Sequence, residues 1–72
     1  MANLPTDRND FRDDVALTMH ELNNVLSVVQ LTADLLDRDA VAPAQASETI
    51  REQVREGVRI VEQLRRRART AD

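Results

Sequence analysis

The chain has no cysteine, no tryptophan and no tyrosine, and its 72 residues include one glycine, one histidine and one aromatic side chain. Without cysteine there is no disulfide and no thiolate metal site, and a lone histidine argues against a metal site built within one chain. A single glycine leaves no glycine-rich loop of the kind that holds nucleotide phosphates. We therefore expect neither a metal ion nor a bound cofactor.

Charge and hydropathy exclude further classes of partner. The formal net charge is -3 and Phe11 is the one aromatic residue, so the chain offers neither a net basic field nor a stacking surface for nucleic acid. No segment approaches the roughly 20 apolar residues of a membrane span, and the first residues lack the apolar core of a signal peptide. We expect a cytoplasmic protein that binds neither nucleic acid nor a membrane. An RNA or anionic-lipid patch at residues 65–69 is the lesser alternative.

The spacing of apolar residues predicts two long helices joined by a short turn. The first helix is expected from about Asp7 or Phe11 to Arg38. The second is expected from Pro43, a residue that suits a first helical position, to about Arg69. The expected segments are a flexible N-terminal lead at 1–10, a helical hairpin at 11–69 and a C-terminal tail at 70–72.

Each predicted helix carries an apolar seam at alternating intervals of three and four residues, which is typical of helices that pack against each other. Folding the chain back at residues 41–42 places Leu26 opposite Gly57, where a glycine permits close approach. Met19 and Leu22 are predicted core residues. The seams are Val15, Met19, Leu22, Leu26, Val29, Ala33 and Leu36 on the first helix, and Ser47, Ile50, Val54, Gly57, Val61, Leu64 and Ala68 on the second.

A second apolar set widens both stripes beyond what one hairpin can cover. A chain of 72 residues is near the lower size limit for a stable single-chain core, and this one has no disulfide to reinforce it. Two hairpins packed side by side would bury the extra apolar surface. The predicted fold is therefore all-α, an antiparallel two-helix hairpin that forms a homodimeric four-helix bundle. The second set is Val25, Val28, Thr32, Leu35, Val58 and Ile60.

Charged residues fit the same arrangement. Acidic residues begin the first helix and arginines end the second, so an antiparallel hairpin brings opposite charges together at its open end. Glutamate and arginine also recur three residues apart along the second helix. We interpret these as solvated structural pairs, each worth about a few tenths of a kcal/mol. The pairs are Glu48–Arg51, Glu52–Arg55, Glu56–Arg59 and Glu62–Arg65.

The lone histidine lies in the run His20-Glu21-Leu22-Asn23-Asn24 of the first predicted helix. His20 and Asn24 are one turn apart and project from the same side, just off the seam, while Leu22 points inward. Consecutive helical residues diverge by about 100°, so we expect Glu21 to face an incoming partner more than it faces His20. The pattern indicates an imidazole displayed to solvent or to a visiting protein.

This run resembles the histidine box of the dimerisation and histidine-phosphotransfer domain of two-component sensor histidine kinases. In that family a histidine is followed by an acidic residue, an apolar residue, a variable residue and then asparagine or threonine, and the pair Asn23-Asn24 is similar to one subclass. Many relatives carry a proline where Val25 stands, so no proline kink is expected here. The resemblance is specific over about residues 15–36, and the hairpin extends it to most of the chain.

The resemblance implies a role for each polar residue of the run. His20 is expected to be the phosphoacceptor, Glu21 the acidic neighbour that orients or deprotonates the imidazole, and Asn24 the residue that positions water when such a domain dephosphorylates a receiver. The family's nucleotide-binding motifs are missing from the chain. A phosphoryl group on His20 therefore has to come from another protein, a response-regulator receiver domain or a histidine kinase. The expected docking surface comprises Thr18, His20, Glu21, Asn24 and Ser27.

Three functions stay open at this point. The first is a histidine phosphotransfer module that exchanges a phosphoryl group between His20 and the aspartate of response-regulator receiver domains. The second is a phosphatase that uses Glu21 and Asn24 to dephosphorylate a receiver without itself being phosphorylated. The third is a non-catalytic helical dimerisation or adaptor protein in which the histidine is incidental. The sequence favours a natural short protein only slightly over a piece of a larger kinase.

Overall fold

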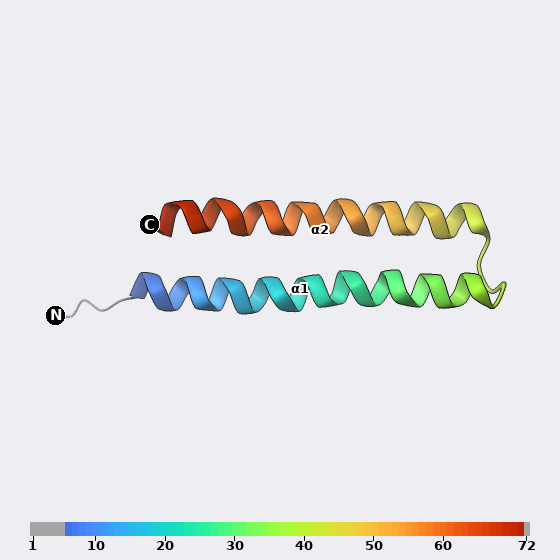
Figure 1. Cartoon of the computed structure of the whole chain (residues 1–72), viewed down its shortest axis with the longest axis horizontal. Helices are drawn as coiled ribbons and strands as arrows, with labels where there is room; N and C mark the ends of the chain where they lie inside the picture. The colour runs from blue at the N-terminus through green and yellow to red at the C-terminus, as the bar shows by residue number, and fades with distance from the viewer. Residues whose placement is uncertain (1–5, 72) are drawn as a thin grey trace.

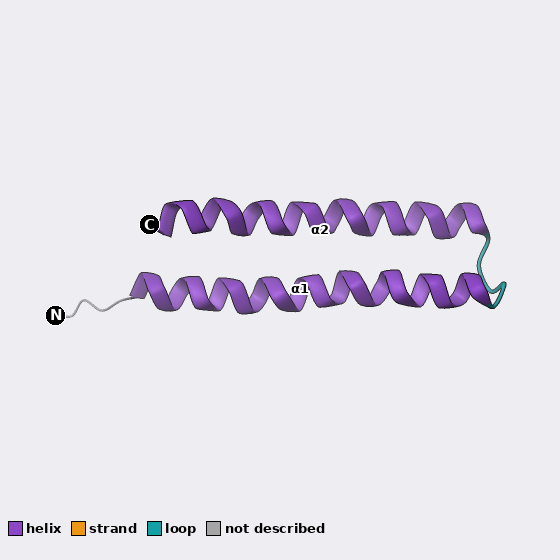
Figure 2. Cartoon of the chain, viewed as in Figure 1, coloured by secondary structure: helices purple, strands orange, loops and turns teal. Residues whose placement is uncertain are grey.

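The computed structural model describes residues 6–71 as two antiparallel helices joined by one short turn (Figure 1, Figure 2). Helix α1 spans Thr6–Asp37 and helix α2 spans Pro43–Ala71. The predicted all-α helical hairpin is confirmed, and it measures 60 × 16 × 9 Å along its principal axes. Residues 6–10 of the predicted lead are helical. Residues 1–5 and 72, the remainder of the lead and the last residue of the predicted tail, lie outside the described part.

The two helices differ in how far their own sequences favour them. Helix α2 is rich in alanine, glutamate, glutamine and arginine, which have high intrinsic helix propensity, and Gly57 is its one glycine. Helix α1 contains asparagine and aspartate residues, among them Asn23, Asn24 and Asp34, which have lower helix propensity and do not occur in α2. Helices of this kind depend more on tertiary packing. The hairpin therefore stabilises α1 more than it stabilises α2.

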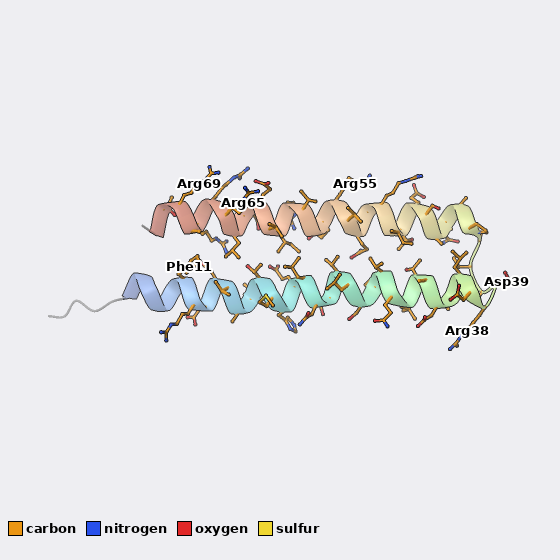
Figure 3. The ribbon with its side chains drawn as sticks, in the orientation of Figure 1. Phe11, Arg38, Asp39, Arg55, Arg65 and Arg69 are labelled. Carbon is orange, nitrogen blue, oxygen red and sulfur yellow. The ribbon has the colours of Figure 1, made fainter. Side chains whose placement is uncertain are left out.

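The turn begins with a Schellman motif at the end of α1. The Asp39 N–H donates to the Leu36 carbonyl at 3.0 Å, and the Ala40 N–H donates to the Leu35 carbonyl at 2.8 Å. Asp39 adopts a φ of 57°, the left-handed conformation that glycine usually supplies and that aspartate tolerates better than most residues. Helix α2 then begins at Pro43, as predicted. Arg38 and Asp39 mark this end of the hairpin in Figure 3.

Small and β-branched side chains form the seam between the helices. Thr18, Val25 and Thr32 follow one another at intervals of seven residues on α1, and all three are buried. Ala46 and Ile60 are the buried residues of α2. Thr32 satisfies its hydroxyl within α1 by donating to the backbone carbonyl of Val28 at 2.7 Å. The core of one hairpin is therefore narrow, and most of the larger aliphatic side chains lie outside it.

The predicted seam is shifted by one residue on both helices. On α2, Ala46 and Ile60 are buried, whereas the predicted Ser47, Val54 and Val61 are exposed. A Cβ atom added to Gly57 would lie 3.7 Å from Val25 Cγ1, so Val25 and not Leu26 faces the glycine. Leu26 is 63% exposed and Met19 is 55% exposed in the single chain, whereas Leu22 is half-buried. Two apolar stripes run side by side along α1. The hairpin packs the β-branched stripe of α1 against α2, and at Gly57 there is room for a methyl group at an ordinary van der Waals distance.

The seam separates two long grooves. The apolar groove has a volume of about 570 Å³, and the polar groove, with about 270 Å³, is half that size. Val25 lines both because it lies on the seam between them. The apolar groove is lined by Leu22, Val25, Leu26, Val29, Gln53, Val54, Gly57, Val58, Val61, Glu62 and Arg65. The polar groove is lined by Glu21, Asn24, Val25, Val28, Gln53, Glu56 and Ile60.

The predicted pairing of charges is confirmed in part. Asp14 of α1 and Arg67 of α2 lie 3.4 Å apart and join the open end of the hairpin. Along α2, Glu62 pairs with Arg65 at 3.4 Å, and Glu56 pairs with Arg59. The other two predicted pairs, which lie nearer the turn, form no ion-pair contact within the described residues. Arg55, a member of one of them, projects away from α1 (Figure 3).

Candidate functional site

His20 is exposed on the outer side of α1, near the middle of the helix. It follows the buried Thr18 by two residues, which is about 200° around the helix, so its side chain points away from α2. Asn24 and Ser27, four and seven residues further on, are exposed as well. A histidine side chain is partly neutral at cellular pH, and its free ring nitrogen is then a nucleophile. The position leaves that ring open to a second protein.

Glu21 points to a different side of α1 from His20. It is half-buried and lines the polar groove, together with Asn24 from the same helix and Gln53 and Glu56 from α2. The carboxylate therefore faces the neighbouring helix, as the divergence of consecutive helical residues requires. The structure brings Glu21 and Asn24 to one groove and leaves His20 on the adjoining outer surface.

The far wall of the polar groove carries an ion pair that the sequence interpretation treated as purely structural. Arg59 Nε donates to Glu56 Oε1 at 3.1 Å, and Arg59 Nη2 donates to Glu56 Oε2. This hydrogen bonding lowers the pKa of the Glu56 carboxyl from its ordinary value of 4.5. For Arg59, the hydrogen bond to Glu56 raises the pKa most, followed by the charge of Glu56 and then by that of Glu21 across the hairpin. The site thus includes charged groups from both helices.

The predicted docking surface needs one correction and one addition. Thr18 is buried against α2, so it does not belong to an exposed docking surface. Leu17, Val28 and Leu31 are exposed and were missing from the predicted surface. Leu17 and Leu31 lie seven residues before and after Asn24, so they share its side of the helix. The sequence did contain a sign of this surface, because Leu17 and Leu31 belong to neither apolar stripe.

Metal-binding clusters and membrane-spanning stretches bear on the chemistry that residues 6–71 can support. Within that range no cluster of three or more histidine, cysteine, aspartate or glutamate side chains could hold a metal ion. Neither α1 nor α2, as far as they are described, contains a stretch long and apolar enough to cross a membrane.

Comparison with known proteins identifies the family. The family model described as the His Kinase A (phospho-acceptor) domain matches residues 15–71. No curated protein and no solved structure matches the chain significantly. The matched range contains His20, Glu21 and Asn24 and nearly all of the hairpin.

Proposed function

Because the chain belongs to the His Kinase A (phospho-acceptor) domain family, which acts in two-component histidine phosphotransfer, we propose that it is a phosphotransfer module with His20 as its phosphoacceptor. A ring nitrogen of His20 attacks the phosphorus of a receiver's aspartyl phosphate, the aspartate C–O–P linkage breaks at phosphorus, and the carboxylate leaves. The reverse step returns the group to a receiver. The observation that supports this proposal is the exposed His20 on a rigid helix, beside a groove that holds Glu21 and Asn24.

The phosphoryl group has to come from outside these 72 residues in this proposal. They hold no nucleotide-binding domain and only one glycine, so they offer no cradle for the phosphates of ATP. The donor is a phosphorylated receiver domain or the nucleotide-binding domain of a histidine kinase. The chain then supplies the acceptor nitrogen and the docking surface. Asn23 and Asn24 directly follow Leu22, and we propose on this basis that the chain belongs to the subclass with paired asparagines.

We further propose that two copies pair through the apolar groove to form a four-helix bundle. Leu26, Val54 and Val58 of that groove are 63, 55 and 56% exposed in the single chain, which is a large unpartnered aliphatic surface for a domain of this size. Burying each such side chain contributes roughly 1.5 to 3 kcal/mol. A bundle formed on that side leaves the polar groove and His20 free. Sedimentation equilibrium at micromolar concentration tests it, and a folded monomer would refute it.

Phosphate analysis of the chain provides the direct test. The full chain is incubated with a panel of receiver domains charged by acetyl phosphate, and acid-labile phosphate is quantified on wild type and on His20→Gln. The expected result is label on the wild type and none on the variant. Asp34→Asn is the matched control, because Asp34 is exposed on the same side of α1, two heptads after His20, and lies outside the expected docking surface. Label that persists in His20→Gln would overturn the assignment.

The second candidate is a receiver phosphatase that uses Glu21 and Asn24, and the shared position of these two residues in the polar groove favours it. An asparagine amide there could hold a water molecule against a receiver's aspartyl phosphate. This reading predicts faster receiver dephosphorylation with no label on His20, sensitivity to Asn24→Ala, and insensitivity to His20→Gln. Absence of both label and dephosphorylation across the panel would favour the adaptor.

A further inference from the structure

The polar groove is lined from both helices, which makes α2 part of the environment of the histidine box. Glu21 and Asn24 come from α1, whereas Gln53, Glu56 and Ile60 come from α2. Of the α2 residues that line the groove, Glu56 is the charged one, and it carries the bidentate contact to Arg59 described above. Arg59 therefore brings a positive charge to the neighbourhood of the polar groove.

The helix register places Arg59 beside the histidine box. Val25 faces Gly57, so in an antiparallel pair a residue two positions after Gly57 lies level with one two positions before Val25. Arg59 is therefore level with Asn23, between Glu21 and Asn24, and about 3 Å along the axis from the level of Glu21 at 1.5 Å per residue. Glu21 is half-buried on the side that faces α2. Arg59 is the nearest cation to Glu21 by register.

Two carboxylates, Glu21 from α1 and Glu56 from α2, line the groove, and Glu56 binds Arg59 through both carboxylate oxygens. A guanidinium bound in this bidentate way is restricted to few side-chain conformations. Arg59 does not line the groove itself, but it follows Glu56 by three residues and precedes Ile60, so its charge lies at the edge of the groove. The other charged groups on this side, by heptad position, are Asp14, Glu52 and Arg66, and Asp14 is paired with Arg67.

We propose that Arg59, oriented by Glu56, is a positioning residue for phosphotransfer at His20 that acts through Glu21. Although it is paired with Glu56, Arg59 offsets part of the negative field of the Glu21 carboxylate, so that a dianionic phosphoryl group approaching His20 meets less negative charge beside it. Phosphoryl transfer depends mainly on positioning and on electrostatic balance, which is why a counter-ion one helix away can matter. This inference rests on the proposed phosphoacceptor role of His20.

The experiment uses the full chain and phosphoramidate, a small phosphoryl donor that needs no receiver. The His20 ring nitrogen attacks phosphorus, the P–N bond of phosphoramidate breaks, and ammonia leaves as ammonium with the proton that the ring gives up. Rates of phosphohistidine formation are compared for wild type, Arg59→Gln, Glu21→Gln and the double variant. Arg66→Gln is the matched control, because it removes an exposed arginine from the same side of α2 one heptad further on.

We expect Arg59→Gln to slow phosphorylation about three- to tenfold, the size expected for one charge acting over several ångströms near a protein surface. In the Glu21→Gln background the same substitution is expected to change the rate less than twofold. Arg59→Lys, which keeps the charge, should restore most of the rate, and Arg66→Gln should match wild type. Circular dichroism melting confirms that each variant is folded.

Two results would overturn the inference. An equal loss in both backgrounds would show that Arg59 does not act through Glu21, and no loss in Arg59→Gln would show that it does not act at all. Failure of the proposed function has a separate signature, because wild type would then acquire no label on His20 from phosphoramidate or from any receiver.

Discussion

The two grooves of the hairpin lie side by side along one seam and have opposite chemistry. The apolar groove presents leucine and valine side chains that are more than half exposed, with charged residues only at one end. The polar groove is smaller and brings Glu21, Asn24 and Glu56 together, with His20 on the surface next to it. The difference separates the surface that we propose for assembly from the surface that we propose for phosphotransfer, on a molecule 16 Å wide.

The two grooves have different requirements in a chain with so small a core. One hairpin buries few large side chains, so in our proposal a second copy covers the apolar groove, while the polar groove stays open for a receiver. Substitutions on the two sides should therefore affect different measurements: oligomeric state and unfolding on one side, phosphotransfer on the other.

The largest contrast is expected between two exposed leucines. Leu26→Glu in the apolar groove should raise the dimer dissociation constant at least about 100-fold, because two buried leucines are lost and two carboxylates would have to be buried. Leu17→Glu is the matched control, since Leu17 is 54% exposed against 63% for Leu26 and lies on the other side of α1. Sedimentation equilibrium measures both. Equal dissociation would contradict the assignment of the grooves.

The next largest effect is expected from substitutions in the seam between the two grooves. Ile60 is 3% exposed, so Ile60→Ala should lower the free energy of unfolding by about 2 to 4 kcal/mol through lost burial and a cavity. Val28→Ala, at a residue 37% exposed, should lower it by less than about 1 kcal/mol. Urea unfolding at one fixed protein concentration measures the difference. Comparable losses would show that Ile60 is not at the centre of the core.

A smaller effect, of opposite sign, is expected at Gly57. A methyl group there would meet Val25 Cγ1 at 3.7 Å, an ordinary van der Waals distance. Gly57→Ala should therefore stabilise the protein by about 0.5 to 1 kcal/mol through higher helix propensity. Thermal unfolding at fixed concentration measures the gain. A loss instead would show that the dimer packs more tightly against Gly57 than the single hairpin does.

The smallest effect concerns the ion pair of the polar groove. The hydrogen bond from Arg59 lowers the pKa of Glu56 in the folded chain from 4.5, so the stabilisation from this pair is present above that pH and is lost as the pH falls through the folded value. The difference in melting temperature between wild type and Glu56→Gln should thus be small near neutral pH and vanish in acid. A difference that grew below pH 4.5 would contradict the pairing.

Much of the fold followed from periodicity and end signals. Pro43 marked the start of α2, and the interval of three and four residues identified both helices. What periodicity did not decide was the rotation of each helix about its own axis. Leu26 and Val25 belong to adjacent stripes that both satisfy a heptad pattern, as do Val61 and Ile60 on α2, and only the packing of the two helices selects Val25 and Ile60 for the seam. The error in Met19 and Leu26 has this single cause.

For the same reason, the sequence predicted some features of the candidate site and not others. The exposure of His20 and Asn24 depends on their spacing from the apolar residues of their own helix, so sequence alone was sufficient. The burial of Thr18 and the meeting of Glu21 and Glu56 in one groove depend on which residues of α2 lie opposite, and local spacing carries no information about that.

The sequence by itself determined two amphipathic helices, the turn that joins them, the family, and the outward position of its single histidine, because each of these depends on contacts within a few residues of the chain. The tertiary structure alone decided the register of α1 against α2, the division of the surface into an apolar and a polar groove, and the place of Glu56 and Arg59 opposite Glu21. These depend on how closely two helix axes can approach, which is a property of side chains that meet from distant parts of the chain.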